Sequence, residues 1–145
     1  MSLLSPSLKI DHARVTAAIA ACELRTSGEI RVLIAREKTT DPIAAARKHF
    51  ERLGMTNTRE RNGVLIYVAP ASHNFAVIGD TGIHEKCGEA FWRLLAAEMS
   101  ARFKAGEFTE GLVQTIEHAG KLLAENFPRS RDDRNELPDK IEEAE

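Results

Sequence analysis

Two short runs in this sequence, at residues 29–35 and 63–69, are apolar on both of their alternating faces. The first run consists of two sets, Ile30, Val32 and Ile34 on one side and Leu33 and Ala35 on the other. A strand of this kind is buried on both faces, as in sheets that carry helices on each side. The two runs therefore predict inner strands of a sheet that helices cover on both sides.

Amphipathic helices are predicted before, between and after these runs. Apolar residues recur at helical spacing in four segments, which we expect at about residues 8–26, 42–53, 84–104 and 109–127. Asp41 fits the N-cap of the second helix, with Pro42 at its first position, and Thr109 is the expected cap of the last helix. The break at residues 70–73, followed by a third apolar run at 75–78, predicts a hairpin.

The order of these elements predicts the fold class. The strand–helix–strand crossover implies a parallel pair, and the following β-hairpin adds an antiparallel strand, so the small sheet is mixed. Helices on both faces then give an α/β fold, a three-layer α/β/α sandwich. The chain has 145 residues, and we expect a single domain over residues 1–127. The tail at 128–145 has seven acids against four bases and is expected to be disordered.

Charge and motif content exclude several classes of function. Lys and Arg total 20 and Asp and Glu total 22, a formal charge of −2, which argues against a nucleic-acid partner. A signal peptide and a membrane-spanning run of about 20 apolar residues are not found, so we expect a cytoplasmic protein with no transmembrane segment. Neither a phosphate-binding Gly-rich loop nor zinc-ligand spacing occurs, and no organic cofactor is expected.

The segment 78–85 is the first candidate site, because ligands of open α/β sheets tend to bind where strands run into helices. Asp80 and Glu85 could hold Ca²⁺ or Mg²⁺ through oxygen ligands, and His84 could transfer a proton. We expect the turn at 79–84 to form an accessible ligand mouth at the rim of the sheet. The same residues also fit a structural role, in which Asp80 or Thr81 caps the helix and Glu85 complements its dipole.

A second candidate segment, residues 58–63, precedes the central strand. Arg59 and Arg61 could clamp an anion, although solvated basic residues are the ordinary case. Asn62-Gly63 is a tight-turn dipeptide.

Several short segments of the sequence together resemble the TPM-domain family, which is named for its thylakoid acid-phosphatase members. They cover most of residues 8–128 and comprise 26–32 (TSGEIRV), Ala46, Phe50, 53–55 (LGM), Thr58, 61–69 (RNGVLIYVA), 78–83 (IGDTGI), Phe91-Trp92 and Gly111-Leu112.

This resemblance implies an α/β/α sandwich. It also implies acid-phosphatase or divalent-cation-binding activity in some members, and in others an accessory role in maintaining membrane complexes or receptors. Exported members often carry an aspartate at the position of Asn62, and its absence here weakens a cation site. Asp80 matches an acidic position in one branch of the family.

Two functional hypotheses follow. In the first, the TPM-like domain is a non-catalytic protein-binding or accessory module with a protein partner and weak divalent-cation binding. In the alternative, it is a low-activity hydrolase, a metal-assisted acid phosphatase acting on a phosphate-containing small molecule, a phosphomonoester. The residues assigned to these roles are Asp80 and His84 for catalysis, Asp80 and Glu85 for the metal, and Arg61, Asn62, Gly79, Thr81 and Gly82 for ligand binding. We favour the first hypothesis, because a hydrolase is expected to bring more charged groups to one strand end.

Overall fold

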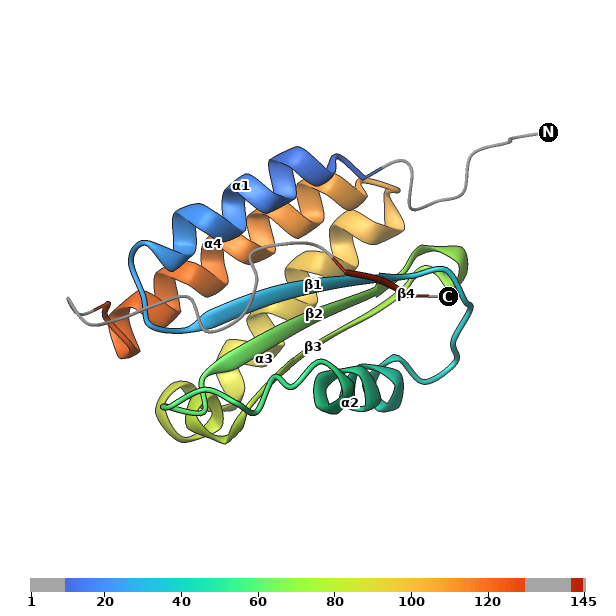
Figure 1. Ribbon diagram of the computed structural model, residues 1–145. Coiled ribbons are helices and arrows are strands. Elements are labelled where there is room, and N and C mark those ends of the chain that lie inside the picture. Colours follow the sequence, from blue (N-terminus) through green and yellow to red (C-terminus); the bar gives the residue numbers. More distant parts are fainter. Residues whose placement is uncertain (1–9, 130–141, 145) are drawn as a thin grey trace.

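A mixed sheet lies between two layers of helices (Figure 1). The computed structural model describes residues 10–129 and 142–144. The elements in chain order are α1 (His12–Glu23), β1 (Glu29–Ala35), α2 (Pro42–Arg52), β2 (Gly63–Ala69), the 3-10 turn η2 (Pro70–Ser72), β3 (Asn74–Gly79), α3 (Thr81–Lys104), α4 (Phe108–Asn126) and β4 (Glu142–Ala144). The sheet has the order β3-β2-β1-β4. β1 and β2 are parallel, and β3 is antiparallel to β2, which confirms the predicted mixed sheet.

The apolar residues form a separate core on each face of the sheet. Ile30, Val32 and Ile34 belong to the larger cluster, in which the sheet packs against α1, α3 and α4. Leu33 and Ala35 belong to the smaller cluster on the α2 side. All residues of β1 and β2 are buried. Because β1 and β2 are apolar on both faces, each face of the sheet is covered by its own layer of helices. This confirms the predicted three-layer sandwich (Figure 1).

The helix boundaries differ from the sequence prediction in two physically informative places. Thr109 lies inside α4 and does not cap it; its hydroxyl instead accepts a hydrogen bond from the backbone N–H of Asp11, 2.9 Å away. The predicted cap of the last helix was therefore wrong. Asp41 does cap α2, as predicted.

The third helix is interrupted. α3 starts at Thr81 rather than near His84, and Gly88 within it has φ 75° and ψ −177°. This is a region of backbone space that is almost restricted to glycine. The apolar residues repeat every four positions across this break, so the pattern alone predicted a continuous helix.

The C-terminal tail contributes one strand. β4 pairs parallel to β1, with Leu33 opposite Glu142 and Ala35 opposite Ala144, and the sequence did not predict it. The disorder expected for 128–145 falls mainly on residues 130–141 and 145, which lie outside the described residues. In the parts of the chain that the structure describes, none of the helices is long and apolar enough to span a membrane.

Candidate functional site

The candidate site lies at the corner where β3 ends and α3 begins. Because β3 runs against β2, its carboxyl end lies beside the start of β2, and the Asp80 N–H donates to Gly63 O at 3.0 Å. The start of β1 is adjacent, with Glu29 N–H donating to Asn62 O at 3.3 Å. The corner is therefore at the amino-terminal edge of the parallel pair. Of the three strands that meet here, only β3 contributes its carboxyl end, whereas ligands of open α/β sheets usually bind at the carboxyl ends of the parallel strands.

Asp80 is the N-cap of α3 and the partner of a guanidinium group. Its Oδ1 accepts from the N–H of Thr81 at 2.8 Å. Arg61 binds both carboxylate oxygens, Nε to Oδ2 at 2.5 Å and Nη2 to Oδ1 at 2.8 Å. This bidentate arrangement is the strong form of the charge-assisted hydrogen bond. The hydrogen bonds and the charge of Asp80 raise the pKa of Arg61.

These contacts give Asp80 the structural role that the sequence left open. The residue is only 5% exposed, and its carboxylate is held by partners instead of standing free as the sequence had led us to expect. A divalent cation at this carboxylate would face the positive charge of Arg61, which already binds both oxygens. The residues as placed therefore do not fit a cation site at Asp80.

Gly82 allows α3 to approach the backbone of the segment before β2. Its N–H donates to Arg61 O at 2.9 Å. A Cβ at this position would lie 2.7 Å from Arg61 O and still closer to Glu60 O. Both neighbours are backbone atoms, so this contact requires glycine for reasons of space.

Asn62 lies inside the same corner and does not line an opening. It is 1% exposed, and its Nδ2 donates to Ser27 Oγ at 3.2 Å and to Glu60 Oε2 at 3.4 Å. Its backbone N–H donates to Thr58 Oγ1 at 3.2 Å. Asn62 thus connects the segments that lead into β1 and β2.

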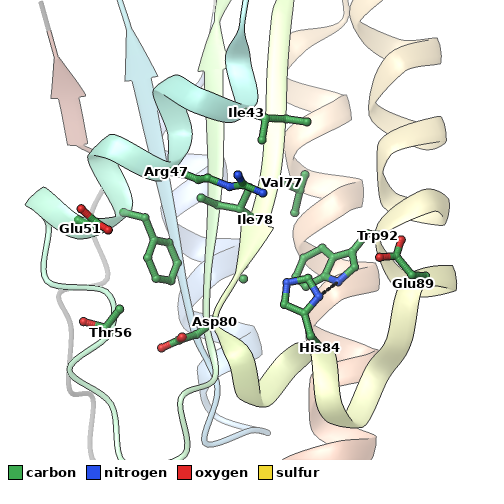
Figure 2. A pocket seen from close by; sticks show the side chains of 12 residues that line it. Ile43, Arg47, Glu51, Thr56, Val77, Ile78, Asp80, His84, Glu89 and Trp92 are labelled. Atoms are coloured by element: carbon green, nitrogen blue, oxygen red, sulfur yellow. Dashed lines mark hydrogen bonds between the residues drawn. The ribbon is translucent and has the colours of Figure 1, made fainter.

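A cleft of about 390 Å³ opens beside this corner, between α2 and α3 and over β3 (Figure 2). Of the predicted site residues, Gly79, Asp80 and His84 line it. Arg61, Asn62, Thr81, Gly82 and Glu85 do not. Sequence reasoning missed most of the lining, including Ile43, Arg47 and Glu51 of α2, Val77 of β3, and Glu89 and Trp92 of α3. These residues lie on three elements far apart in the sequence, and no local motif connects them.

His84 and Trp92 together form the α3 wall of the cleft. Trp92 Nε1 donates to His84 Nδ1 at 3.2 Å, and the ring centroids are 5.2 Å apart, as Figure 2 shows. The Trp92 ring also packs against Gly79, where an added Cβ would be 2.8 Å from its Cζ2. Glu85 is exposed on α3. Across residues 10–129 and 142–144, His, Cys, Asp and Glu form no group of three or more that could hold a metal ion.

The chain is thus a small α/β/α domain in which Asp80 caps the helix that follows the antiparallel edge strand. A family model described as the TPM domain matches residues 2–122. The chain belongs to the TPM domain family, as its sequence phrases indicated. Among curated proteins, none matches it significantly.

Solved structures support the same assignment. The solution structure of the BA42 protein from the psychrophilic bacterium Bizionia argentinensis is 40% identical, with a TM-score of 0.85, and 91% of each chain is covered. The N-terminal domain of the cg2496 protein from Corynebacterium glutamicum is 12% identical, with a TM-score of 0.60, over 89% of this chain and 75% of that one. An N-terminal domain from P. gingivalis is 16% identical, with a TM-score of 0.59, over 90% of this chain and all of that one. The last two likenesses concern the fold alone.

Proposed function

We propose that this TPM domain is a non-catalytic binding module for another protein and that the cleft between α2 and α3 is its binding surface. The observation that carries the proposal is the state of Asp80. Both of its oxygens are held by Arg61, and one also caps α3. The carboxylate on which a metal-assisted reaction would depend therefore serves to hold the corner together.

The composition of the cleft supports binding. Ile43 is a large apolar side chain with 52% of its surface exposed, and it shares the cleft with Trp92. Arg47, Glu51 and Glu89 also line it, and none of the three forms an ion pair with another described residue. Exposed apolar groups next to charged groups that lack partners are typical of surfaces that bind other molecules.

The alternative, a metal-assisted phosphatase, makes a different demand on the corner. Asp80, with Glu85, would have to hold Ca²⁺ or Mg²⁺, with His84 as the acid or base and Arg61 as the phosphate clamp. Two N–H groups of Arg61 already bind Asp80, so a phosphate could use only its remaining N–H groups, and a cation at Asp80 would have to displace Arg61 from the carboxylate. The binding proposal requires no such displacement.

A hydrolysis assay separates the two functions. The purified protein is incubated with p-nitrophenyl phosphate and Mg²⁺, Ca²⁺ or EDTA, together with Asp80→Asn and the matched control Asp11→Asn. Asp11 also caps a helix, α1, through its side chain, but it lies outside the cleft lining. We expect no metal-dependent turnover from any of the three proteins. Turnover that needs metal, is lost in Asp80→Asn and is kept in Asp11→Asn, with unchanged circular dichroism, would refute the proposal.

Cation binding is tested independently of turnover. Ca²⁺ is titrated while the amide chemical shifts of residues 79–85 are followed by NMR. We expect these shifts to stay constant, because Arg61 already neutralises Asp80. Saturable movement in this segment that is absent from Asp80→Asn would show a cation site instead.

A further inference from the structure

One edge of the sheet is unpaired. β3 is the terminal strand and pairs with β2 alone among the described strands. The bond from the Asp80 N–H to Gly63 O fixes the pattern, because alternate residues of an antiparallel strand turn both backbone groups toward the same neighbour. Counting back from Asp80, the residues that face away from β2 are Phe75, Val77 and Gly79. Within residues 10–129 and 142–144, their outward N–H and C=O groups have no partner.

The sequence of this edge does not protect it. Residues 74–79 read NFAVIG and contain neither a proline nor a charged side chain, which are two of the devices by which natural edge strands resist further pairing. β3 also differs from β1 and β2 in that most of its residues are only partly buried. Its free edge is therefore available to another extended backbone.

The edge lies along the cleft, which supplies a wall on each side. The Val77 side chain packs with the larger core on the α3 side, and Ile78 packs with the smaller core on the α2 side. Arg47 extends from α2 over the strand, and Trp92 forms the opposite wall (Figure 2). A strand added to β3 would alternate its side chains between these two walls, because successive residues of a strand point to opposite faces.

The opposite edge of the same sheet already accepts a strand of this kind. β4 adds parallel to β1 through three residues, Glu142–Ala144. Two of these are glutamates, so the strand has little apolar content of its own. Strand addition through backbone pairing is thus a property that this sheet displays at one of its two edges.

We infer that an extended segment of a partner protein adds to β3 in the cleft as a further strand. This inference rests on the proposed function and specifies how the binding module recognises its partner. Backbone pairing with Phe75, Val77 and Gly79 supplies affinity. Specificity comes from apolar side chains that meet Trp92, alternating with acidic side chains that meet the guanidinium of Arg47, which forms no ion pair with the described residues.

The test uses a synthetic peptide as the probe. It is acetylated and amidated, and valine alternates with aspartate over about seven residues. Binding is followed by the amide shifts and hydrogen exchange of Phe75, Val77 and Gly79, and separately by the fluorescence of Trp92, the one tryptophan of the chain. We expect these three amides to become protected when the peptide binds, while the peptide quenches or shifts the Trp92 emission.

Two N-methylated peptides test whether the backbone is what binds. One is methylated on its valines and the other on its aspartates, so each lacks the N–H groups that point to one edge. Strand addition predicts that one of the two loses at least roughly tenfold in affinity, through two or three lost hydrogen bonds. The other keeps the affinity of the parent peptide.

A pair of protein variants gives the same test from the other side. Val77→Pro removes an outward N–H, which edge strands tolerate, and Val77→Thr keeps that N–H on a β-branched residue. We expect Val77→Pro to lose peptide binding and Val77→Thr to retain it. If Val77→Pro does not fold, the N-methylated peptides decide the matter.

The outcomes distinguish this inference from the proposed function. If Trp92 responds but both methylated peptides bind equally, strand addition is wrong while the cleft remains a binding surface. If the parent peptide leaves the three amides unchanged at millimolar concentration, strand addition is also wrong, and the hydrolysis assay alone decides the proposed function. If the protein forms a dimer that Val77→Pro dissociates, a second copy of the chain occupies the β3 edge. The inference that a different protein binds there would then be wrong.

Discussion

The contact between Gly82 and the segment before β2 predicts a large effect of a small substitution, Gly82→Ala. The added Cβ would lie 2.7 Å from Arg61 O, and real Cβ atoms essentially never approach another heavy atom within 3.0 Å. Overpacking of this kind costs roughly 1–3 kcal/mol. Relief requires α3 to move away from the loop, which breaks the bond from the Gly82 N–H to Arg61 O and costs about another 1 kcal/mol. We therefore expect Gly82→Ala to lower the free energy of unfolding by roughly 2–4 kcal/mol.

Urea unfolding followed by circular dichroism measures this loss. With a slope of about 2 kcal/mol per molar urea, the midpoint should fall by roughly 1–2 M. Gly28→Ala is the matched control, because its Cβ would meet only side-chain atoms, the two methyl ends of Leu123 at 3.2 and 3.4 Å and the Thr26 hydroxyl oxygen at 3.4 Å, and we expect a loss below about 1 kcal/mol. If Gly82→Ala is no less stable than Gly28→Ala, the close approach is not what requires glycine at this position, and a role in ligand binding becomes the better explanation.

Three further predictions follow from the contacts described. Asp80→Ala should lower stability by about 1 kcal/mol more than Asp80→Asn in urea unfolding, because the amide oxygen can still cap α3; equal losses would contradict the capping role. Burial, and secondarily the charge of Arg52, lowers the pKa of His49, so the unfolded chain binds a proton before the folded one as the pH falls. The free energy of unfolding should therefore decrease as the pH drops through about 6.5, with a smaller decrease in His49→Gln; identical pH profiles would exclude His49 as the cause. Burial raises the pKa of both thiols, but Cys22 is buried and Cys87 only partly so, and iodoacetamide should label Cys87 first in a time course read by mass spectrometry, the reverse order refuting the assignment.

The sheet and its layers were predictable because they depend on patterns that are local in the sequence. Two strands that are apolar on both faces need cover on both sides, and the crossover and the hairpin turn fix their directions. β4 carried no such signal, because Glu142 and Glu143 show no apolar alternation and pair through the backbone. Side-chain periodicity therefore could not have predicted this strand.

The sequence directed attention to the turn between β3 and α3, but it did not indicate the contacts that the residues there make. Asp80 and Arg61 were assigned separate roles, as a metal ligand and a phosphate clamp, yet they bind each other across 19 positions of the sequence. Thr109 was misassigned for the same reason, since its partner, Asp11, is 98 residues away. Residue types indicate which chemistry a side chain can perform, whereas its partner depends on how distant segments meet.

The two faces of the sheet are covered by different numbers of helices, three on one face and one on the other, and this difference affects how the domain opens. A single helix of 11 residues, α2, covers one face, and a helix of that length is marginal when isolated in water. If α2 detached, Leu65 and Tyr67 would be exposed to solvent, while α1, α3 and α4 would still cover the other face of the sheet. Amides of α2 should therefore exchange through local opening, whereas those of β2 await global unfolding. We therefore expect a partly unfolded form of the domain, in which α2 has left one face of the sheet and the other face remains native.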